Sequence, residues 1–426
     1  MHLTIFQDFI DIIRGKKRTY LYFNMFRNAY KKRISKLSEK YKNGEKIKVA
    51  FLHMYATSIQ DVCVFDEMLK DDVFEPYFIV NPDVYRSKEN FDYNYNRTKN
   101  ELIEKYGNER VLDGYNYEKD EYVDYTNNFD IATTNNPYDA MAHQYFKIKY
   151  WALKKIPMFY ISYFYMGRCH VTVDNLINNE FSYLWTIFAE NKTVLDLAKK
   201  YQTIKGKNIV ITGYPKMDKL STLDMTNNND KKIVIIAPHH TIQDNELSLG
   251  GFLQYYDAIL QLPKKYPEIT FVFRPHPMLI ENLNTLYWGE EKTKQYMDEL
   301  LSNENVIYST EGDYLELFAK SDALIHDCGS FLAEYLYTDK PCAYLYKKGL
   351  NADKVWTELG KGMVDCHYIV NNSVDLDKFI EDVVIKGDDS LKEKRKKWFE
   401  NNIKMDYPNV TKNIYKILKN NVVSGK

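Results

Sequence analysis

The chain has 426 residues, of which 45% are hydrophobic and 27% are charged, and this size allows two or three domains, each with its own core. Lys and Arg (58 residues) balance Asp and Glu (59), which argues against a protein whose whole surface binds nucleic acid, so no nucleic-acid partner is expected. The five cysteines are scattered and form no C-x-x-C pair, so we expect no disulfide framework, no cysteine-bound metal and a cytoplasmic protein.

Residues 1–45 predict a basic amphipathic helical arm. Apolar residues recur at helical spacing from Leu3 to Ile13, and Lys and Arg crowd between and after them as far as Lys36. Such a helix can lie on an anionic membrane surface, where each Lys or Arg contributes about 1 kcal/mol to binding. A helix packed on the body of the protein, or on a partner chain, shows the same pattern. Membrane contact through residues 1–40 is therefore one of two open alternatives.

Residues 46–219 alternate between short apolar segments and helical segments, which predicts parallel βαβ units and a Rossmann-like N-terminal domain. The strands are expected at 46–52, 76–80, 109–112, 129–133, 157–162, 183–189 and 208–213. The polar stretch at 220–230 has the composition of a linker.

Residues 231–400 repeat the alternation and predict a second Rossmann-like domain. Its strands are expected at 231–237, 269–273, 305–308, 322–326 and 342–346. Residues 401–426 are expected to form a C-terminal helix. Two doubly wound α/β domains joined by a linker predict an active site in the cleft between them.

Polar turns follow three predicted strands of the second domain, at 238–241, 274–277 and 327–330. Because the carboxyl ends of parallel strands meet at one edge of a sheet, we expect these turns to converge on a ligand. Arg274 and His276 lie in a turn stiffened by two prolines, and a rigid pair of cations suits a diphosphate. A structural turn with a surface arginine is the alternative.

The third turn begins a predicted helix. Gly329 and Ser330 can bind an anion through backbone N–H groups and the positive end of the helix dipole, although an ordinary N-cap is a common use of a serine there. Glu334, in the first turns of this helix, can accept hydrogen bonds from ribose hydroxyls or be a solvated glutamate.

His239 and His240 are adjacent in the first turn. On an extended backbone, neighbouring side chains point to opposite sides, so we expect one histidine to pack and no metal ion to be shared. The predicted turns carry no D-x-D triplet. We therefore expect neither a metal nor another cofactor.

Four motifs in the second half resemble the CDP-glycerol glycerophosphotransferase family, which includes teichoic-acid polymerases and capsule enzymes. Segment 213–220 (GYPKMDKL) is similar to the family's G-Y-P-R-N-D-x-L, and segment 322–330 (DALIHDCGS) is similar to its D-x-L-I-T-D-Y-S-S. His276-Pro277 and Lys340-Pro341 match its H-P and K-P pairs. The order and spacing of the motifs agree over 205–346.

This resemblance implies a GT-B fold, in which two Rossmann-like domains face a cleft, with the donor nucleotide in the C-terminal domain and the acceptor in the N-terminal domain. It also implies transfer of a polyol phosphate from a CDP-activated donor to a hydroxyl of a cell-surface polysaccharide, lipid-linked or teichoic-acid-like acceptor, with CMP leaving. By position, His276 would contact the donor pyrophosphate, and Gly329 and Ser330 would hold its phosphates. Arg274 is a catalytic candidate from the residues themselves, because its charge can neutralise the phosphoryl oxygens. The residues assigned to donor binding are His239, Asp327, Cys328, Gly329, Ser330, Glu334, Pro215 and Lys216.

The sequence departs from the family pattern in three places. Cys328 replaces a tyrosine and Gly329 replaces a serine. The W-H-G segment that supplies the acceptor-side histidine of the polymerases is absent, and residues 160–167 take its place. The general base is therefore open, with His53 and the segment 170–174 as candidates. A branch of the family from capsule and surface-polysaccharide clusters is similar at 48–82 and 136–139.

Three other functions remain open. A GT-B glycosyltransferase that uses a nucleotide sugar would need the same cations and the same anion site. A sugar epimerase of the same fold would need no acceptor. A catalytically silent scaffold in surface-polymer assembly would explain the absent W-H-G segment.

Overall fold

The computed structural model describes residues 2–56, 60–165, 167–168, 179–227, 229–310 and 313–426, with side chains from residue 17 onward. The chain divides into two compact units. The N-terminal unit comprises Met1–Phe164, Val171–Asp218 and Met405–Lys426, and the C-terminal unit comprises Tyr165–His170 and Lys219–Lys404.

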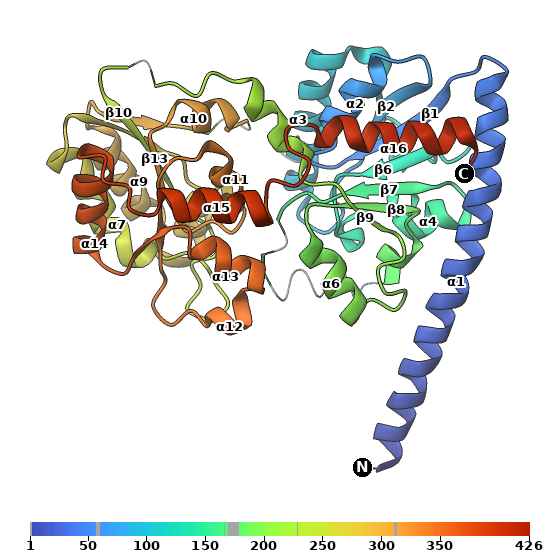
Figure 1. Cartoon of the computed structure of the whole chain (residues 1–426), viewed down its shortest axis with the longest axis horizontal. Coiled ribbons are helices and arrows are strands. Elements are labelled where there is room, and N and C mark those ends of the chain that lie inside the picture. Colours follow the sequence, from blue (N-terminus) through green and yellow to red (C-terminus); the bar gives the residue numbers. More distant parts are fainter. Residues whose placement is uncertain (1, 57–59, 166, 169–178, 228, 311–312) are drawn as a thin grey trace. The chain divides into compact units, whose positions relative to one another are not determined.

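The N-terminal unit contains a seven-stranded parallel sheet in the order β3-β2-β1-β6-β7-β8-β9 (Figure 1). The strands are β1 (Ile47–His53), β2 (Phe74–Val80), β3 (Val111–Asp113), β6 (Ile131–Thr134), β7 (Met158–Ile161), β8 (Thr186–Ala189) and β9 (Ile209–Ile211), with a small hairpin of β4 (Tyr115–Asn116) and β5 (Glu121–Tyr122). The helices are α1 (His2–Lys42), α2 (Val62–Leu69), α3 (Lys88–Tyr106), α4 (Ile148–Leu153), α6 (Lys192–Tyr201) and α16 (Val410–Ser424). The strand order reverses between β1 and β6, which is the pattern of a doubly wound fold.

The C-terminal unit contains a six-stranded parallel sheet in the order β12-β11-β10-β13-β14-β15. The strands are β10 (Lys232–Ala237), β11 (Ile269–Phe273), β12 (Val306–Tyr308), β13 (Ala323–His326), β14 (Cys342–Leu345) and β15 (Tyr368–Val370). The helices are α7 (Phe252–Lys265), α8 (Pro277–Asn282), α9 (Glu290–Leu301), α10 (Leu315–Lys320), α11 (Phe331–Glu334), α12 (Ala352–Val355), α13 (Glu358–Val364), α14 (Ser373–Lys378) and α15 (Lys392–Asn402). This is the strand order of a Rossmann fold, with the reversal between β10 and β13.

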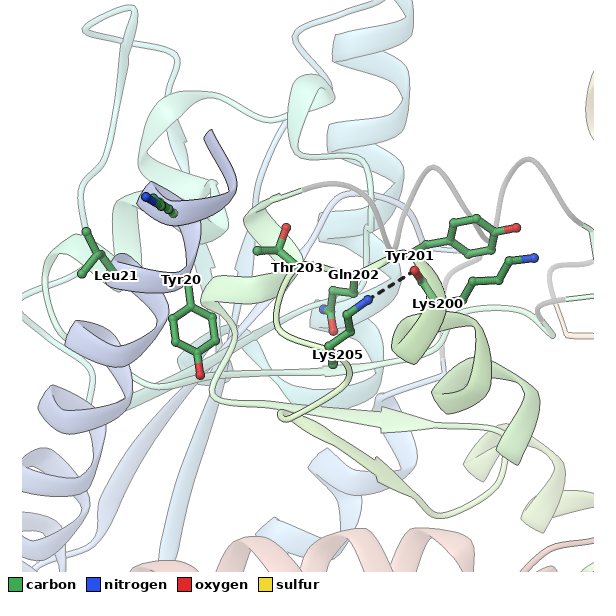
Figure 2. A pocket seen from close by; sticks show the side chains of 8 residues that line it. Tyr20, Leu21, Lys200, Tyr201, Gln202, Thr203 and Lys205 are labelled. Atoms are coloured by element: carbon green, nitrogen blue, oxygen red, sulfur yellow. Dashed lines mark hydrogen bonds between the residues drawn. The ribbon is translucent and has the colours of Figure 1, made fainter. Parts of the chain in front are cut away.

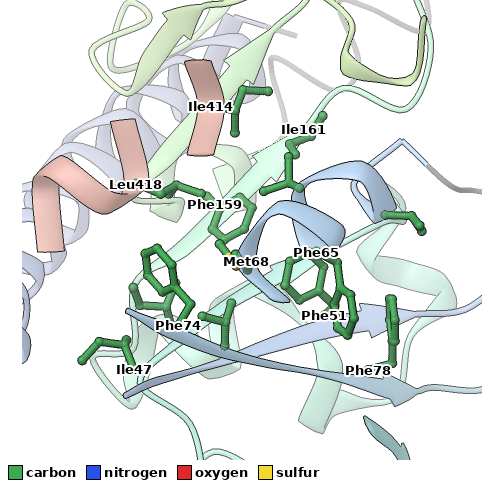
Figure 3. Close-up of a cluster of buried hydrophobic side chains, with 14 of the residues drawn as sticks. Ile47, Phe51, Phe65, Met68, Phe74, Phe78, Phe159, Ile161, Ile414 and Leu418 are labelled. Carbon is green, nitrogen blue, oxygen red and sulfur yellow. The ribbon is translucent and has the colours of Figure 1, made fainter. Parts of the chain in front are cut away.

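Phenylalanine side chains fill the core beside β1 and β2. Phe65 of α2 stacks on Phe78 of β2 with ring centroids 3.9 Å apart, and Phe51 of β1 meets Phe65 edge-on at 5.1 Å. Ile414 and Leu418 of α16 belong to the same cluster (Figure 3). Strands buried on both faces are apolar over their whole length, and this is why their positions could be predicted from the sequence.

Helix α1 is anchored on the N-terminal unit along its second half. Tyr30 and Ile34 are buried, and the Tyr30 hydroxyl donates a hydrogen bond to the Tyr183 carbonyl at 2.7 Å. Arg33 and Lys40 both bind the carboxylate of Asp130, at 3.0 and 2.7 Å. This part of the arm is therefore packed on the body of the protein. None of the described helices has both the length and the apolar content needed to cross a membrane.

The final helix returns to the N-terminal unit. The sequence suggests one helix over 401–426, whereas α15 ends at Asn402 and α16 begins at Val410. The 213–220 motif holds the start of α16, because the Asp218 carboxylate accepts the Thr411 N–H at 2.6 Å. Gly213 has a φ of +105°, and a Cβ atom there would lie 2.8 Å from Val410. Glycine is therefore needed both for its backbone angle and for its lack of a side chain.

Candidate functional site

Three polar turns of the C-terminal unit begin at the same edge of its sheet. In the sheet register, Ile236 of β10 pairs with Phe273 of β11, and Ala237 of β10 pairs with His326 of β13. Strand β10 lies where the strand order reverses, which is the position at which open α/β sheets bind their ligands. This edge of the sheet is our candidate functional site.

Asp327 connects two of these turns. Its carboxylate is fully buried and accepts the backbone N–H of His239 at 2.5 Å and that of Gly251, before α7, at 2.6 Å. Burial raises the pKa of Asp327 to about 7, although the two N–H groups stabilise the ionised form. Because both oxygens are occupied by the backbone, the observed role of Asp327 is to position the 238–241 turn.

The histidines of the first two turns converge. The ring centroids of His239 and His240 are 4.5 Å apart, and His276 lies 4.1 Å from His240 and 5.1 Å from His239. The expectation that the adjacent pair would point to opposite sides is wrong. Strand β10 ends at Ala237, so the pair lies in a turn, where the alternation of an extended strand does not apply.

Arg274 faces a different set of partners from His276. Its guanidinium donates to the Ser309 hydroxyl at 2.8 Å and lies 5.4 Å from the ring centre of Tyr314, a cation–π contact. The Tyr314 hydroxyl in turn donates to the buried carboxylate of Glu334. Arg274 and Glu334 are thus linked through one tyrosine, and Glu334 is not a solvated helical residue.

The start of α11 carries the third turn. Ser330 is the N-cap residue but makes no side-chain capping hydrogen bond, so its hydroxyl does not serve the ordinary capping role. Burial raises the pKa of the Cys328 thiol to about 12, so this cysteine is a neutral thiol at physiological pH. The helix has only four residues before it continues as a 3₁₀ turn.

Arg168 is a residue at this edge that the sequence did not indicate. It belongs to the short segment Tyr165–His170 that packs in the C-terminal unit. A Cβ atom on Gly329 would lie 3.6 Å from the Arg168 side chain, which also donates to the Leu247 carbonyl at 2.9 Å. The charge of Arg168 contributes, after burial and the neighbouring histidines, to lowering the pKa of His239. No sequence signal pointed to Arg168, because it lies far along the chain from the other residues of the site.

The remaining predicted residues lie in the N-terminal unit. His53, at the end of β1, is 1% exposed and its Nε2 lies 3.0 Å from the Asp61 carboxylate. Pro215 accepts a hydrogen bond from the Thr411 hydroxyl at 3.4 Å. Lys216 follows it in the same unit, and their assignment to the donor stays a prediction. The alternative base segment at 170–174 lies outside the described residues.

Asp139 is a titratable group at the carboxyl edge of the N-terminal sheet. Asp139, after β6, accepts the Ile148 N–H at 3.0 Å, and burial raises its pKa to about 7. Next to it, the Tyr138 and Tyr163 hydroxyls lie 3.4 Å apart. A carboxylate with a pKa near neutrality can accept a proton at physiological pH.

A separate cavity of about 500 Å³ lies between α1 and the end of α6 (Figure 2). Three of its lining residues are basic: Lys17, Lys200 and Lys205. Tyr20 and Leu21 of α1 contribute an apolar side. A cavity with an apolar wall and several ammonium groups suits an amphipathic anion rather than the chemistry of the C-terminal edge.

A comparison with family models agrees with the resemblance that the sequence predicts. Residues 171–354 match the family model of CDP-glycerol:poly(glycerophosphate) glycerophosphotransferase. The predicted family resemblance is confirmed. A sequence comparison with curated proteins finds no match.

Solved structures show the fold. The wall teichoic acid polymerase TagF is 14% identical, with a TM-score of 0.55 over 96% of this chain and 98% of that one. The UDP-GlcNAc 2-epimerase of Neisseria meningitidis, bound to UDP-GlcNAc, is 17% identical, with a TM-score of 0.53 over 88% and 100% of the two chains. The enzyme from Methanocaldococcus jannaschii, in complex with UDP-GlcNAc and UDP, is 14% identical, with a TM-score of 0.55 over 88% and 99%.

At these identities the likeness establishes the fold alone, and the predicted α/β fold of GT-B type is confirmed. The family match supports a role as a transferase of the glycerophosphotransferase kind.

Proposed function

We propose that this glycerophosphotransferase-like chain transfers a polyol phosphate, such as glycerol phosphate, from a CDP-activated donor to a hydroxyl of a cell-surface polysaccharide or teichoic-acid-like acceptor. The observation that carries the proposal is the family match over 171–354, which includes the polar turns at 238–241, 274–277 and 327–330. In this proposal the C-terminal edge binds the donor diphosphate. The N-terminal unit binds the acceptor.

The reaction is an attack of the acceptor oxygen on the distal phosphorus, with CMP as the leaving group. Such a transfer requires mainly positioning and neutralisation of the charge that spreads over the phosphoryl oxygens. Arg274 and Arg168 supply fixed positive charge at the C-terminal edge, and His276 supplies a hydrogen-bond donor. Burial lowers the pKa of His276 to about 3, so we assign it a neutral imidazole that donates N–H to the donor.

The general base is assigned to the carboxyl edge of the N-terminal sheet. Asp139 is half-buried, and its raised pKa suits proton transfer near pH 7. His53 is oriented by Asp61 but is almost completely buried, which favours a structural role. We therefore place Asp139 before His53 as the base.

A donor screen tests the proposal. The full chain is incubated with CDP-glycerol, CDP-ribitol or UDP-sugars, with and without a polysaccharide acceptor, while release of CMP or UDP is followed. We expect acceptor-dependent CMP release, which His276→Ala abolishes while leaving the fold intact. His143→Asn, in the N-terminal unit, is the matched control, because asparagine keeps the capping bond that His143 accepts from Tyr145.

The alternatives give different results in the same screen. Turnover of UDP-sugars alone would point to a glycosyltransferase, and conversion of a nucleotide sugar without acceptor would point to an epimerase. Titration with CDP distinguishes a scaffold, which would show no measurable affinity.

We also propose that the enzyme works on the cytoplasmic face of the membrane. In this proposal, anionic lipid headgroups bind in the cavity between α1 and α6 and hold the enzyme there. The lysines of the cavity favour anionic headgroups, each contributing about 1 kcal/mol. Reversing the charge of Lys17, Lys200 and Lys205 to Glu should weaken binding to phosphatidylglycerol vesicles by roughly 100-fold or more. The control reverses three exposed lysines of α15: Lys392, Lys394 and Lys396. Equal binding by both variants would leave α1 as a packed helix only.

A further inference from the structure

Three histidines form a compact cluster at the C-terminal edge, and nothing in the proposed transfer requires all three. His239 and His240 come from the turn after β10, and His276 comes from the turn before α8. One ring nitrogen from each lies within 4.8 Å of the others. Three imidazoles from two turns are brought together by the fold rather than by their spacing along the chain.

The backbone around the cluster is tightly held. His276 N–H donates to the Pro238 carbonyl at 2.9 Å, which joins the two turns directly. The His240 carbonyl accepts the Asn282 side-chain amide at 3.0 Å. The buried carboxylate of Asp327 fixes the His239 N–H. The positions of the three Cα atoms are therefore set before any ligand binds, as a preorganised site requires.

The three side chains belong to a ligand type that transition metals prefer. A neutral imidazole has a free lone pair and is a common ligand of Zn²⁺, Cu²⁺ and Ni²⁺, whereas Mg²⁺ and Ca²⁺ prefer oxygen ligands.

We propose that His239, His240 and His276 bind one transition-metal ion, Zn²⁺ in the first instance, with the fourth coordination position open to water or to an oxygen of an anion. Three protein ligands and one open position are the arrangement of a reactive rather than a structural zinc site. Metal–nitrogen bonds of about 2.0–2.1 Å bring the three nitrogens to about 3.4 Å from one another. The half-buried side chains reach this by small rotations.

The neighbouring groups fit this role. Nδ1 of His239 lies 2.8 Å from the Thr241 hydroxyl and accepts the Thr241 N–H at 3.3 Å. With the proton on Nδ1, the ring would instead donate a hydrogen bond to this hydroxyl and leave Nε2 for the metal. Nδ1 of His276 accepts the Met278 N–H at 3.2 Å, which is a long hydrogen bond. Coordination of the metal through Nε2 would move the ring proton to Nδ1, and this hydrogen bond would then be lost. The threonine is thus an outer-shell partner. The metal would bind through His239 and His276, which are assigned to the donor, and there it can act as a Lewis acid on a phosphate oxygen. In the metal-bound site this interaction replaces the N–H that His276 donates to the donor.

Metal binding is tested without donor or acceptor, so its failure leaves the proposed transfer untouched. The full chain, without a polyhistidine tag and freed of metal with EDTA, is titrated with Zn²⁺ in competition with a chromophoric chelator. We expect one equivalent bound, no displacement by excess Mg²⁺, and visible ligand-field bands when Co²⁺ replaces Zn²⁺. His240→Ala should weaken binding by more than ~100-fold, since loss of an outer-shell partner alone costs about 10–100-fold.

His143→Asn is again the control and should bind like the wild type. Because a variant can misfold, thermal unfolding provides a second measurement. Zn²⁺ should raise the Tm of the wild type and of the control but not that of His240→Ala, since a ligand stabilises only the state that binds it. The proposal is overturned if wild type and His240→Ala bind Zn²⁺ equally, or if the bound Co²⁺ shows no ligand-field band that depends on His240.

Discussion

Replacing Asp327 with asparagine should loosen the candidate site more than the loss of one charge suggests. The carboxylate uses one oxygen for the His239 N–H and the other for the Gly251 N–H, at 2.5 and 2.6 Å, and has no access to solvent. An amide of the same shape keeps one acceptor, so one backbone N–H then faces an NH₂ group. A buried donor left without a partner costs about 1–3 kcal/mol.

We therefore expect Asp327→Asn to lower the free energy of unfolding by roughly 1–3 kcal/mol. With a urea m-value of about 3 kcal/mol/M, the midpoint falls by about 0.3–1 M. Hydrogen–deuterium exchange should show the largest loss of protection at 238–251. The exposed Asp244 lies in the same unit, and Asp244→Asn is the control.

The pH dependence provides an independent check. The folded pKa of Asp327 is about 7, well above its value of about 3.9 in the unfolded chain, so the native state binds this proton more tightly. Through this proton, Asp327 adds to the free energy of unfolding. The addition is fully present below about pH 4 and is lost as the pH rises through about 7. The Asp327→Asn variant should lack this pH dependence of the free energy of unfolding. An unchanged urea midpoint, with unchanged exchange at 238–251, would refute the positioning role of Asp327.

Three further outcomes are expected. Gly213→Ala should destabilise the N-terminal unit by about 1–3 kcal/mol in urea unfolding, because its positive φ and the 2.8 Å approach to Val410 both oppose a side chain. Gly349→Ala is the control, since Gly349 has a φ of +85° and open space around it, and its destabilisation measures the backbone effect alone. Tyr314→Phe should cost about 1.5–3 kcal/mol in the same assay, since the buried Glu334 carboxylate loses a donor while Arg274 keeps its ring contact. Asp139→Asn should lower kcat/KM by about 10²–10⁴-fold and remove the rise in activity with pH that the wild type shows up to about pH 7, measured as CMP release from pH 5 to 9.

The sequence predicted the sheets well and the side-chain arrangement poorly. Buried parallel strands such as β1 and β11 are continuous apolar runs bounded by polar turns, so their positions follow from local composition. Strand β15 was not predicted, since it is three residues long and only partly buried. The return of α16 to the N-terminal unit depends on contacts across nearly 200 residues of sequence, such as Asp218 with Thr411, which composition does not reveal.

At the candidate site, too, the backbone arrangement could be predicted and the side-chain arrangement could not. The edge of the sheet could be predicted, because it follows from the order of strands and polar turns. The convergence of the histidines could not, since it depends on the turn geometry after Ala237 rather than on strand alternation. Arg168 was missed because its segment joins the C-terminal unit from between two elements of the other unit.

The contacts of the family-like motifs explain why motif matching locates an edge without identifying the atoms that meet the donor. Asp322 accepts the Ile233 N–H at 2.9 Å and so fixes β13 beside β10. Lys340 donates to the carbonyls of Ala319 and Ser321, at 2.5 and 2.6 Å, and thereby closes the end of α10. Asp327 holds the turn after β10 in the same way. These residues bind backbone groups, so they set the position and direction of the turns. The chemistry then depends on which side chains those turns carry, and in this chain the turn after β10 carries two histidines.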